Sequence, residues 1–90
     1  MASFTFWNDP GHGWVQVSAL DIVRAGLTPS AFSGYSYRQG RGTDATYYLE
    51  EDCDAPKFIN AWTARFGKPE LVDEYRANIF IRRLHRLCEG

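Results

Sequence analysis

The segment from residue 55 to residue 66 is the strongest constraint on the fold, because its pattern predicts a single amphipathic helix. Its aromatic residues recur every four positions, at Phe58, Trp62 and Phe66. With 3.6 residues per turn, these side chains share one face of a helix. Gly67 follows directly and is typical of a helix end. Such an apolar face must be buried against another layer, so the chain needs a sheet or a second helix to cover it.

Four shorter segments alternate apolar and polar residues with the two-residue period of strands. They fall into two pairs, each joined by a loop that contains glycine, which is the arrangement of two hairpins. The segments are residues 4–7 with 14–18, and residues 34–38 with 45–50. After the first pair, Ser18 and Asp21 have the spacing of a capping box, which predicts a helix that begins at residue 19.

Together these elements predict a small α+β domain that spans residues 1–90 as one unit. We expect an antiparallel sheet built from the two hairpins, with helices packed on one side of it. The expected helices are residues 19–25, 55–66 and 78–87. In the last of these, Phe80, Leu84 and Leu87 would form the buried stripe. The segment 71–75 fits a strand and a helix equally well, so its assignment stays open.

The composition is that of a globular protein, with 44% hydrophobic and 16% aromatic residues. The net charge of −1 gives no overall attraction to nucleic acid or anionic lipid, so binding of that kind needs a local patch. Two cysteines are too few for a disulfide framework. The N-terminus lacks the pattern of a signal peptide, and no stretch is apolar enough to span a bilayer. We therefore expect a cytoplasmic protein without a membrane partner.

Residues 44–54 join an aromatic strand to four carboxylates that lie within five positions. A carboxylate that is buried without a partner loses several kcal/mol of hydration, so we expect this acidic run to lie at the surface. Exposed tyrosine beside charge is typical of protein interaction surfaces. The predicted partner-binding residues are therefore Tyr37, Tyr48, Glu50, Glu51, Asp52 and Asp54.

Two other interpretations of the acidic run stay open. In the first, Asp52 or Asp54 caps the helix at 55–66 and the glutamates are merely solvated, because anions stabilise a helix N-terminus. In the second, Glu50, Asp52 and Asp54 hold a hard cation such as Mg²⁺ or Ca²⁺. The spacing of these acids is not that of a calcium-binding loop, so the second interpretation is weaker.

The turn at residues 9–13 places His12 between two glycines. Histidine titrates near neutral pH, so His12 could act as a general base, with Asp9 accepting a proton of its ring. A small metal-dependent hydrolase or nuclease that uses His12 and the carboxylates of residues 50–54 is therefore an alternative function. The simpler interpretation is a tight structural turn, because one His beside one Asp has no nucleophile or second acid to complete a mechanism. We assign no catalytic residue, metal ligand or cofactor.

A second candidate surface, of opposite charge, lies toward the C-terminus. It consists of Arg76, Arg82, Arg83 and Arg86. These side chains could bind phosphates or an acidic protein surface. No helix-turn-helix, zinc module or aromatic RNA-binding signature accompanies them, so nucleic-acid binding is an alternative and not the leading interpretation.

Three motifs together resemble a group of small uncharacterised bacterial proteins of phage and plasmid origin. The motifs are the Gly-His-Gly turn at residues 11–13, Tyr-Ser-Tyr at 35–37 and the Tyr-Leu-Glu-Glu-Asp-Cys-Asp segment at 48–54. The resemblance implies a mobile-element background, in which small proteins often act by binding host proteins. We therefore expect a non-enzymatic protein-binding module that inhibits a host defence complex such as a CRISPR effector. Its partner would be a host protein or complex with a basic surface.

Overall fold

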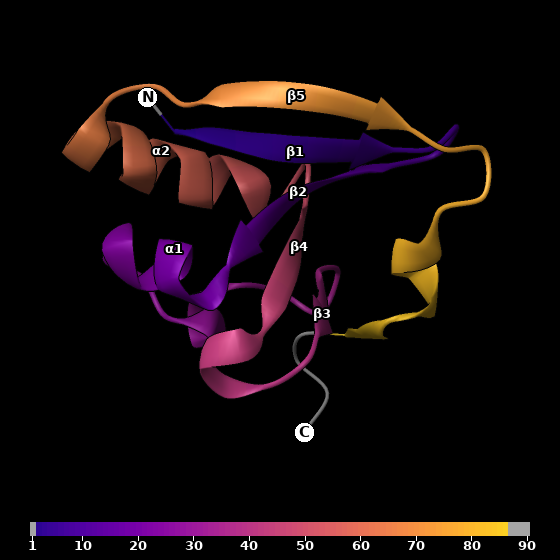
Figure 1. The fold of residues 1–90 in the computed structure, drawn as a ribbon, viewed down its shortest axis with the longest axis horizontal. Coiled ribbons are helices and arrows are strands. Elements are labelled where there is room, and N and C mark those ends of the chain that lie inside the picture. Colours follow the sequence, from indigo (N-terminus) through magenta and orange to yellow (C-terminus); the bar gives the residue numbers. More distant parts are fainter. Residues whose placement is uncertain (1, 87–90) are drawn as a thin grey trace.

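A six-stranded mixed sheet forms the centre of the molecule (Figure 1). The structure is a computed structural model that describes residues 2–86, with side chains described up to residue 84. The strands follow one another across the sheet in the order β5-β1-β2-β4-β3-β6. Their bounds are β1 Ser3–Asn8, β2 Gly13–Ser18, β3 Tyr37–Gln39, β4 Thr46–Glu50, β5 Glu70–Tyr75 and β6 His85–Arg86. With two α-helices packed on this sheet, the predicted α+β class is confirmed.

Both predicted hairpins are present as antiparallel strand pairs, β1 with β2 and β3 with β4. Antiparallel pairing of β2 with β4 joins the two hairpins into one sheet. Val15 lies opposite Leu49 in this central ladder, and both side chains are buried. The sheet therefore has its most protected strands, β2 and β4, at its centre.

Two α-helices, α1 (Ala19–Arg24) and α2 (Ala55–Phe66), contribute to one hydrophobic core on one face of the sheet (Figure 1). Ser18 and Asp21 form the predicted capping box, in which each side chain accepts a hydrogen bond from the backbone amide of the other. Among the described residues, no helix has the length and apolar character needed to cross a membrane. Two short 3₁₀ helices complete this part of the chain, η1 Pro29–Ala31 and η2 Gly42–Asp44.

The apolar stripe of α2 is confirmed for two of its three aromatic residues. Phe58 and Trp62 are buried, and their rings meet the ring of Phe4 edge-on at centroid distances of 5.2 and 5.1 Å. The expectation that Phe66 belongs to the buried stripe is wrong, because its side chain is 56% exposed. Phe66 is the last residue of the helix, and its ring packs on that of Trp62 at a centroid distance of 4.6 Å.

The segment at 71–75, whose assignment stayed open, belongs to strand β5. β5 pairs with β1 in parallel, which the prediction of a purely antiparallel sheet did not include. Helix α2 connects β4 to β5, so the chain crosses over β2 and β1 before it joins the far edge of the sheet. A connection between parallel strands needs such a crossover. β5 is the outermost strand, and no other strand lies beyond it in the part of the chain described.

The predicted helix at 78–87 is wrong. The structure has instead a short 3₁₀ helix, η3 (Phe80–Arg83), followed by the two-residue strand β6. Ile79 and Ile81 are buried, whereas Phe80 between them is 37% exposed. The buried positions of this segment are therefore two residues apart, and not three or four residues apart as in the predicted helical stripe. The predicted stripe residue Leu87 lies outside the described residues.

This C-terminal segment covers the second face of the sheet. Ile79 and Ile81 form a separate hydrophobic cluster with Trp14 and Tyr48, and Leu84 packs against it. Helices α1 and α2 do share one side, as predicted. However, the opposite side is buried as well, so the central strands have no solvent-exposed face.

Candidate functional site

The acidic run at 50–54 contains two buried and two accessible carboxylates. Asp54 is 1% exposed and Glu50 is 7% exposed, so the expectation that the whole run lies at the surface is wrong. The Asp54 carboxylate accepts hydrogen bonds from the Ser33 amide at 2.9 Å, from the Ser33 hydroxyl at 2.8 Å and from the Ser36 hydroxyl. These donors replace the water that a buried carboxylate loses, so its burial needs no cation.

Glu50 closes the turn between β4 and α2. Its Oε2 accepts hydrogen bonds from the backbone amides of Asp52 at 2.8 Å and Cys53 at 2.9 Å. Asp54 occupies the N-cap position of α2 but makes no side-chain capping bond, so the predicted cap by Asp52 or Asp54 is wrong. Local desolvation and the nearby Glu50 and Asp54 carboxylates raise the pKa of the Cys53 thiol, which disfavours a reactive thiolate.

The tyrosines of the predicted surface are also largely covered. Tyr48 is buried beside the C-terminal segment, and this burial raises the pKa of its hydroxyl. Tyr37 is half-buried, with its ring 6.1 Å from that of Trp14. Because the second face of the sheet is covered, a strand position that faces away from the helices is not exposed. The predicted partner-binding residues that keep accessible surface are Tyr37, Glu51 and Asp52.

The predicted basic surface contains an arginine whose charge is already balanced. Arg82 binds the carboxylate of Asp9 through two hydrogen bonds, of 2.7 and 3.2 Å. Its guanidinium also lies 5.2 Å from the centre of the Trp14 ring. Arg82 therefore joins the C-terminal segment to the β1–β2 turn and is not free to bind a phosphate.

The other predicted basic residues do not extend this surface. Arg76 donates to Glu74 at 3.2 Å and lies 5.2 Å from the centre of the Trp7 ring. Arg83 is exposed, and the side chain of Arg86 lies outside the described part of the chain. The described arginines thus include two that are bound to carboxylates of this chain, which weakens the nucleic-acid interpretation.

The β1–β2 turn is built around the carboxylate of Asp9. Its Oδ1 accepts hydrogen bonds from the amides of Gly11 at 2.9 Å and His12 at 2.8 Å. The Arg82 guanidinium and these two amides hold the pKa of Asp9 well below its usual range. Asp9 therefore fixes the backbone of the turn, and the expectation that it accepts a ring proton of His12 is wrong. The imidazole is 51% exposed, and its Nδ1 lies 3.9 Å from Oε1 of Glu50.

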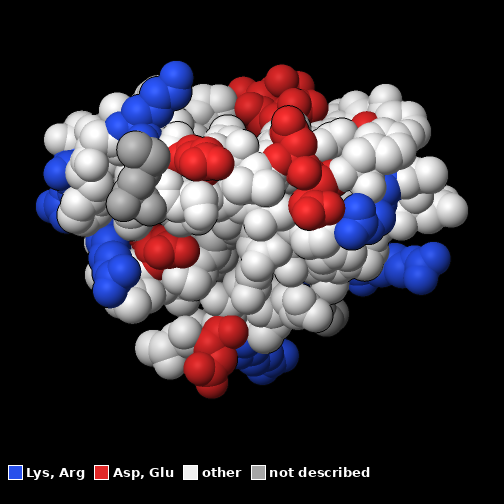
Figure 2. Space-filling view, turned by 45° about the horizontal axis from the view of Figure 1, so that its top comes forward, with Lys and Arg blue, Asp and Glu red and all other residues white. Residues whose placement is uncertain are grey.

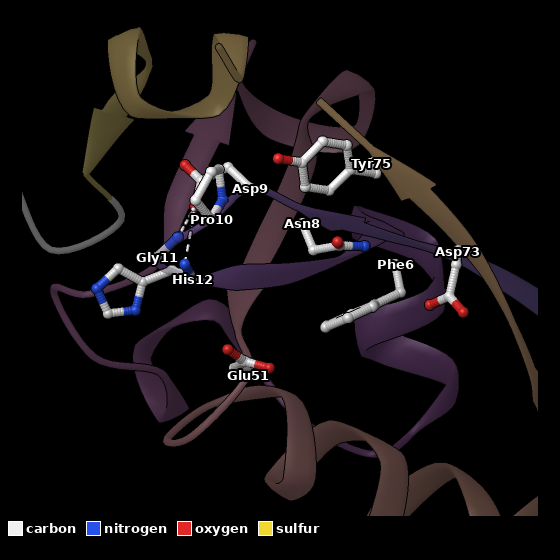
Figure 3. Close-up of a pocket in the computed structure, with 9 residues that line it drawn as sticks. All are labelled: Phe6, Asn8, Asp9, Pro10, Gly11, His12, Glu51, Asp73 and Tyr75. Carbon is white, nitrogen blue, oxygen red and sulfur yellow. Dashed lines mark hydrogen bonds between the residues drawn. The ribbon is translucent and has the colours of Figure 1, made fainter. Parts of the chain in front are cut away.

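An open hollow of about 450 Å³ lies beside this turn (Figure 3). We call it the acidic hollow, and define it by turn residues 9–12 together with Phe6, Asn8, Glu51, Asp73 and Tyr75. The ring of Phe6 forms its floor next to Gly13. A Cβ at Gly13 would lie 2.3 Å from Cζ of Phe6, so only glycine lets this ring lie against the turn. Figure 3 shows the Tyr75 ring pointing from β5 toward the turn.

Three carboxylates, those of Asp9, Glu51 and Asp73, line the acidic hollow, and its lining contains no lysine or arginine among the described residues. Glu51 and Asp73 lie on opposite sides of Phe6 (Figure 3), while the charge of Asp9 is balanced by its ion pair. Carboxylates and the faces of aromatic rings both attract an ammonium or guanidinium group. With the rings of Phe6 and Tyr75 beside them, these carboxylates suit a cationic side chain.

Sequence reasoning missed Phe6, Asp73 and Tyr75 as site residues. They come together because β5 pairs with β1 in a register that places Phe6 beside Asp73 and Asn8 beside Tyr75. The residues of β5 are separated from β1 by more than half of the chain, so no local pattern brings them together. The mixture of apolar and acidic residues at 71–75 was the only local signal, and it fitted a helix as well as a strand.

Metal binding by the acidic run is not favoured by this geometry. Glu50 binds the amides of its own turn, whereas Asp54 binds Ser33 and Ser36, so the two carboxylates serve separate sets of donors. Across the residues described, no three His, Cys, Asp or Glu side chains are grouped as ligands of one ion. The predicted set of Glu50, Asp52 and Asp54 therefore does not converge.

No family model, curated protein or solved structure matches this chain. The resemblance to small phage and plasmid proteins therefore stays a prediction.

Proposed function

We propose that this chain is a small protein-binding module that holds a basic side chain of its partner in the acidic hollow. One observation carries the proposal. Glu51 and Asp73 border an open, aromatic-lined space, and neither carboxylate forms an ion pair with another described residue. A lysine or arginine of a partner would supply the missing counter-charge and would also contact the exposed ring of Tyr75.

The shape of the site favours a protein over a small molecule. Pockets for small ligands enclose most of the ligand surface and are mostly apolar. The acidic hollow is open at the surface, and polar groups make up much of its lining. Aromatic rings flanked by charge at an accessible position are typical of protein interfaces.

The proposal keeps the predicted kind of partner but moves the binding surface. The proposed binding surface excludes Tyr48, Glu50 and Asp54, because these predicted residues are buried. It includes the predicted residue Glu51 and adds Asp73. We further propose that the partner is a host defence complex, on the strength of the resemblance to phage and plasmid proteins. A CRISPR effector holds its nucleic acid in a positively charged channel, to which an acidic surface is complementary.

A hydrolase or nuclease based on His12 has less support. The nearest carboxylate, Glu50, lies 3.9 Å from the imidazole and already accepts hydrogen bonds from two amides. A general base needs a reacting group within hydrogen-bond reach and a partner that orients it. Because the His12 imidazole is exposed, it could contact a partner protein as readily as it could take part in a reaction.

The proposal is tested by reversing one charge in the hollow and one elsewhere. Tagged wild-type, Asp73→Lys and Asp44→Lys proteins would be passed through a lysate of the bacterial host, and bound proteins would be quantified by mass spectrometry. Asp73 and Asp44 are both exposed, and Asp44 lies in η2, away from the hollow. We expect one partner to bind the wild type and Asp44→Lys, and to be recovered at least about tenfold less with Asp73→Lys.

Folding of each variant would be checked by circular dichroism and thermal melting before the comparison. Equal recovery of every enriched protein with Asp73→Lys and Asp44→Lys would reject the acidic hollow as the binding surface. Hydrolysis of a substrate that is abolished by His12→Asn in the folded protein would support the enzymatic alternative instead.

A further inference from the structure

The outer edge of β5 carries main-chain groups that no strand within residues 2–86 pairs with. The amides of Glu70 and Arg76 donate to the carbonyls of Ala2 at 3.0 Å and Asn8 at 2.9 Å. The even-numbered residues of β5 therefore face β1. Main-chain groups alternate in direction along a strand, so the odd-numbered residues face away from the sheet. The outward N–H groups are those of Leu71, Asp73 and Tyr75.

Of the features that usually protect a sheet edge, β5 has charged side chains but lacks the structural ones. It pairs with β1 over its full length of six residues without a bulge or a proline. Leu71 and Val72 are each 43% exposed, so the described chain covers their side chains only in part. A regular edge of this kind, beyond which no described strand lies, is a template for an added strand.

The charges of β5 indicate which chain fits there. Glu70, Asp73 and Glu74 give the strand three carboxylates, and among the described residues only Glu74 has an ion-pair partner, Arg76. Figure 2 turns the top of the molecule, where β5 lies, toward the viewer and shows acidic side chains gathered on its upper part. Two copies paired along this edge would bring like charges together, which is destabilising. A basic strand would be attracted instead.

We infer that β5 accepts an extended, basic segment of the partner as an additional strand of the sheet. The outward main-chain groups of β5 would pair with those of the segment, while its side chains alternate between the two faces. Asp73 and Tyr75 belong both to β5 and to the acidic hollow, so a lysine or arginine beside Asp73 enters the hollow directly. The inference rests on the proposed function and adds the mode of binding and the chemistry of the bound segment.

The test uses a synthetic peptide of alternating lysine and valine as the probe. Its control is the same peptide methylated at every backbone nitrogen, which keeps the charge but has no N–H groups to donate. Isotope-labelled protein would be titrated with each peptide, and amide hydrogen exchange would be followed residue by residue. We expect the first peptide to slow exchange at Leu71 and Asp73, and the methylated peptide to bind at least about tenfold more weakly.

Equal affinity for the two peptides, or unchanged exchange at Leu71 and Asp73 with the first peptide in excess, would overturn strand addition. Protection of the same amides without peptide, in a protein that sediments as a dimer, would also overturn it. Strand addition at β5 can be rejected without rejecting the proposed function. If Asp73→Lys loses the partner from the lysate while the edge amides stay unprotected, the acidic hollow is retained and only this mode of binding is rejected.

Discussion

Asp54 shows how this chain buries a carboxylate without placing a cation beside it. Its carboxylate accepts hydrogen bonds from the amide and hydroxyl of Ser33 and from the hydroxyl of Ser36. Both serines lie in the segment between η1 and β3. Ser36 donates to Asp54, and its oxygen also accepts a hydrogen bond from the amide of Glu50. One buried side chain therefore ties that segment to the end of β4 and to the start of α2.

Replacing Asp54 by alanine should destabilise the fold by about 2–4 kcal/mol, because it leaves the buried hydroxyl of Ser36 and the partly buried donors of Ser33 without this acceptor. The matched control is Asp52→Ala, since Asp52 is two positions away and exposed. The control should change the free energy of unfolding by no more than about 0.5 kcal/mol. Urea denaturation of both variants measures the difference. Equal stability of the two variants would show that the Asp54 network contributes nothing to folding.

The burial of individual acids could not be predicted from the sequence. Glu50 and Glu51 are adjacent and chemically alike, yet Glu50 is buried and Glu51 borders the acidic hollow. The difference depends on turn amides for Glu50 and, for Asp54, on serines that lie 18 and 21 positions earlier in the chain. β4 ends at Glu50, and the local pattern could not show that both faces of the sheet are covered along this strand.

Among the helices and strands, the sequence correctly predicted the ones whose sequence patterns are local. The Ser18 capping box, the period of α2 and the two hairpins each depend on residues within a few positions of one another, and all are present. Strand β5 and the C-terminal segment depend on distant partners. β5 is a strand because β1 lies beside it, and the segment that contains η3 lies against the sheet because Trp14 and Tyr48 offer Ile79 and Ile81 an apolar surface.

Trp62→Ala should lower the free energy of unfolding by about 3–5 kcal/mol, because it opens a cavity between α2 and the sheet next to Phe4 and Phe58. Phe66→Ala is the matched control, one turn later on the same helix. It should cost no more than about 1 kcal/mol, since its ring is exposed and contacts mainly Trp62. Thermal and urea unfolding compare the two. A larger loss for Phe66→Ala would contradict the packing of α2 described here.

At the scale of the whole molecule, covering both faces of the sheet restricts where a partner can bind. α1 and α2 occupy one face, and residues 79–84 occupy much of the other. The edge of β5 and the end of the sheet at the β1–β2 turn stay accessible, and the acidic hollow lies where the two meet. The fold thus brings together, in one region, carboxylates without an ion pair to a described residue, the exposed ring of Tyr75 and main-chain groups that no described strand pairs with.

The central claim, that a basic partner binds at the acidic hollow, is tested most directly by association kinetics. The partner recovered from the lysate would be mixed with wild-type, Asp73→Asn and Asp44→Asn proteins over a range of ionic strength. We predict that Asp73→Asn lowers the association rate constant by about twofold to tenfold at low salt and flattens its salt dependence, whereas Asp44→Asn leaves both near wild type. Identical association rate constants for Asp73→Asn and Asp44→Asn at low salt would contradict the claim.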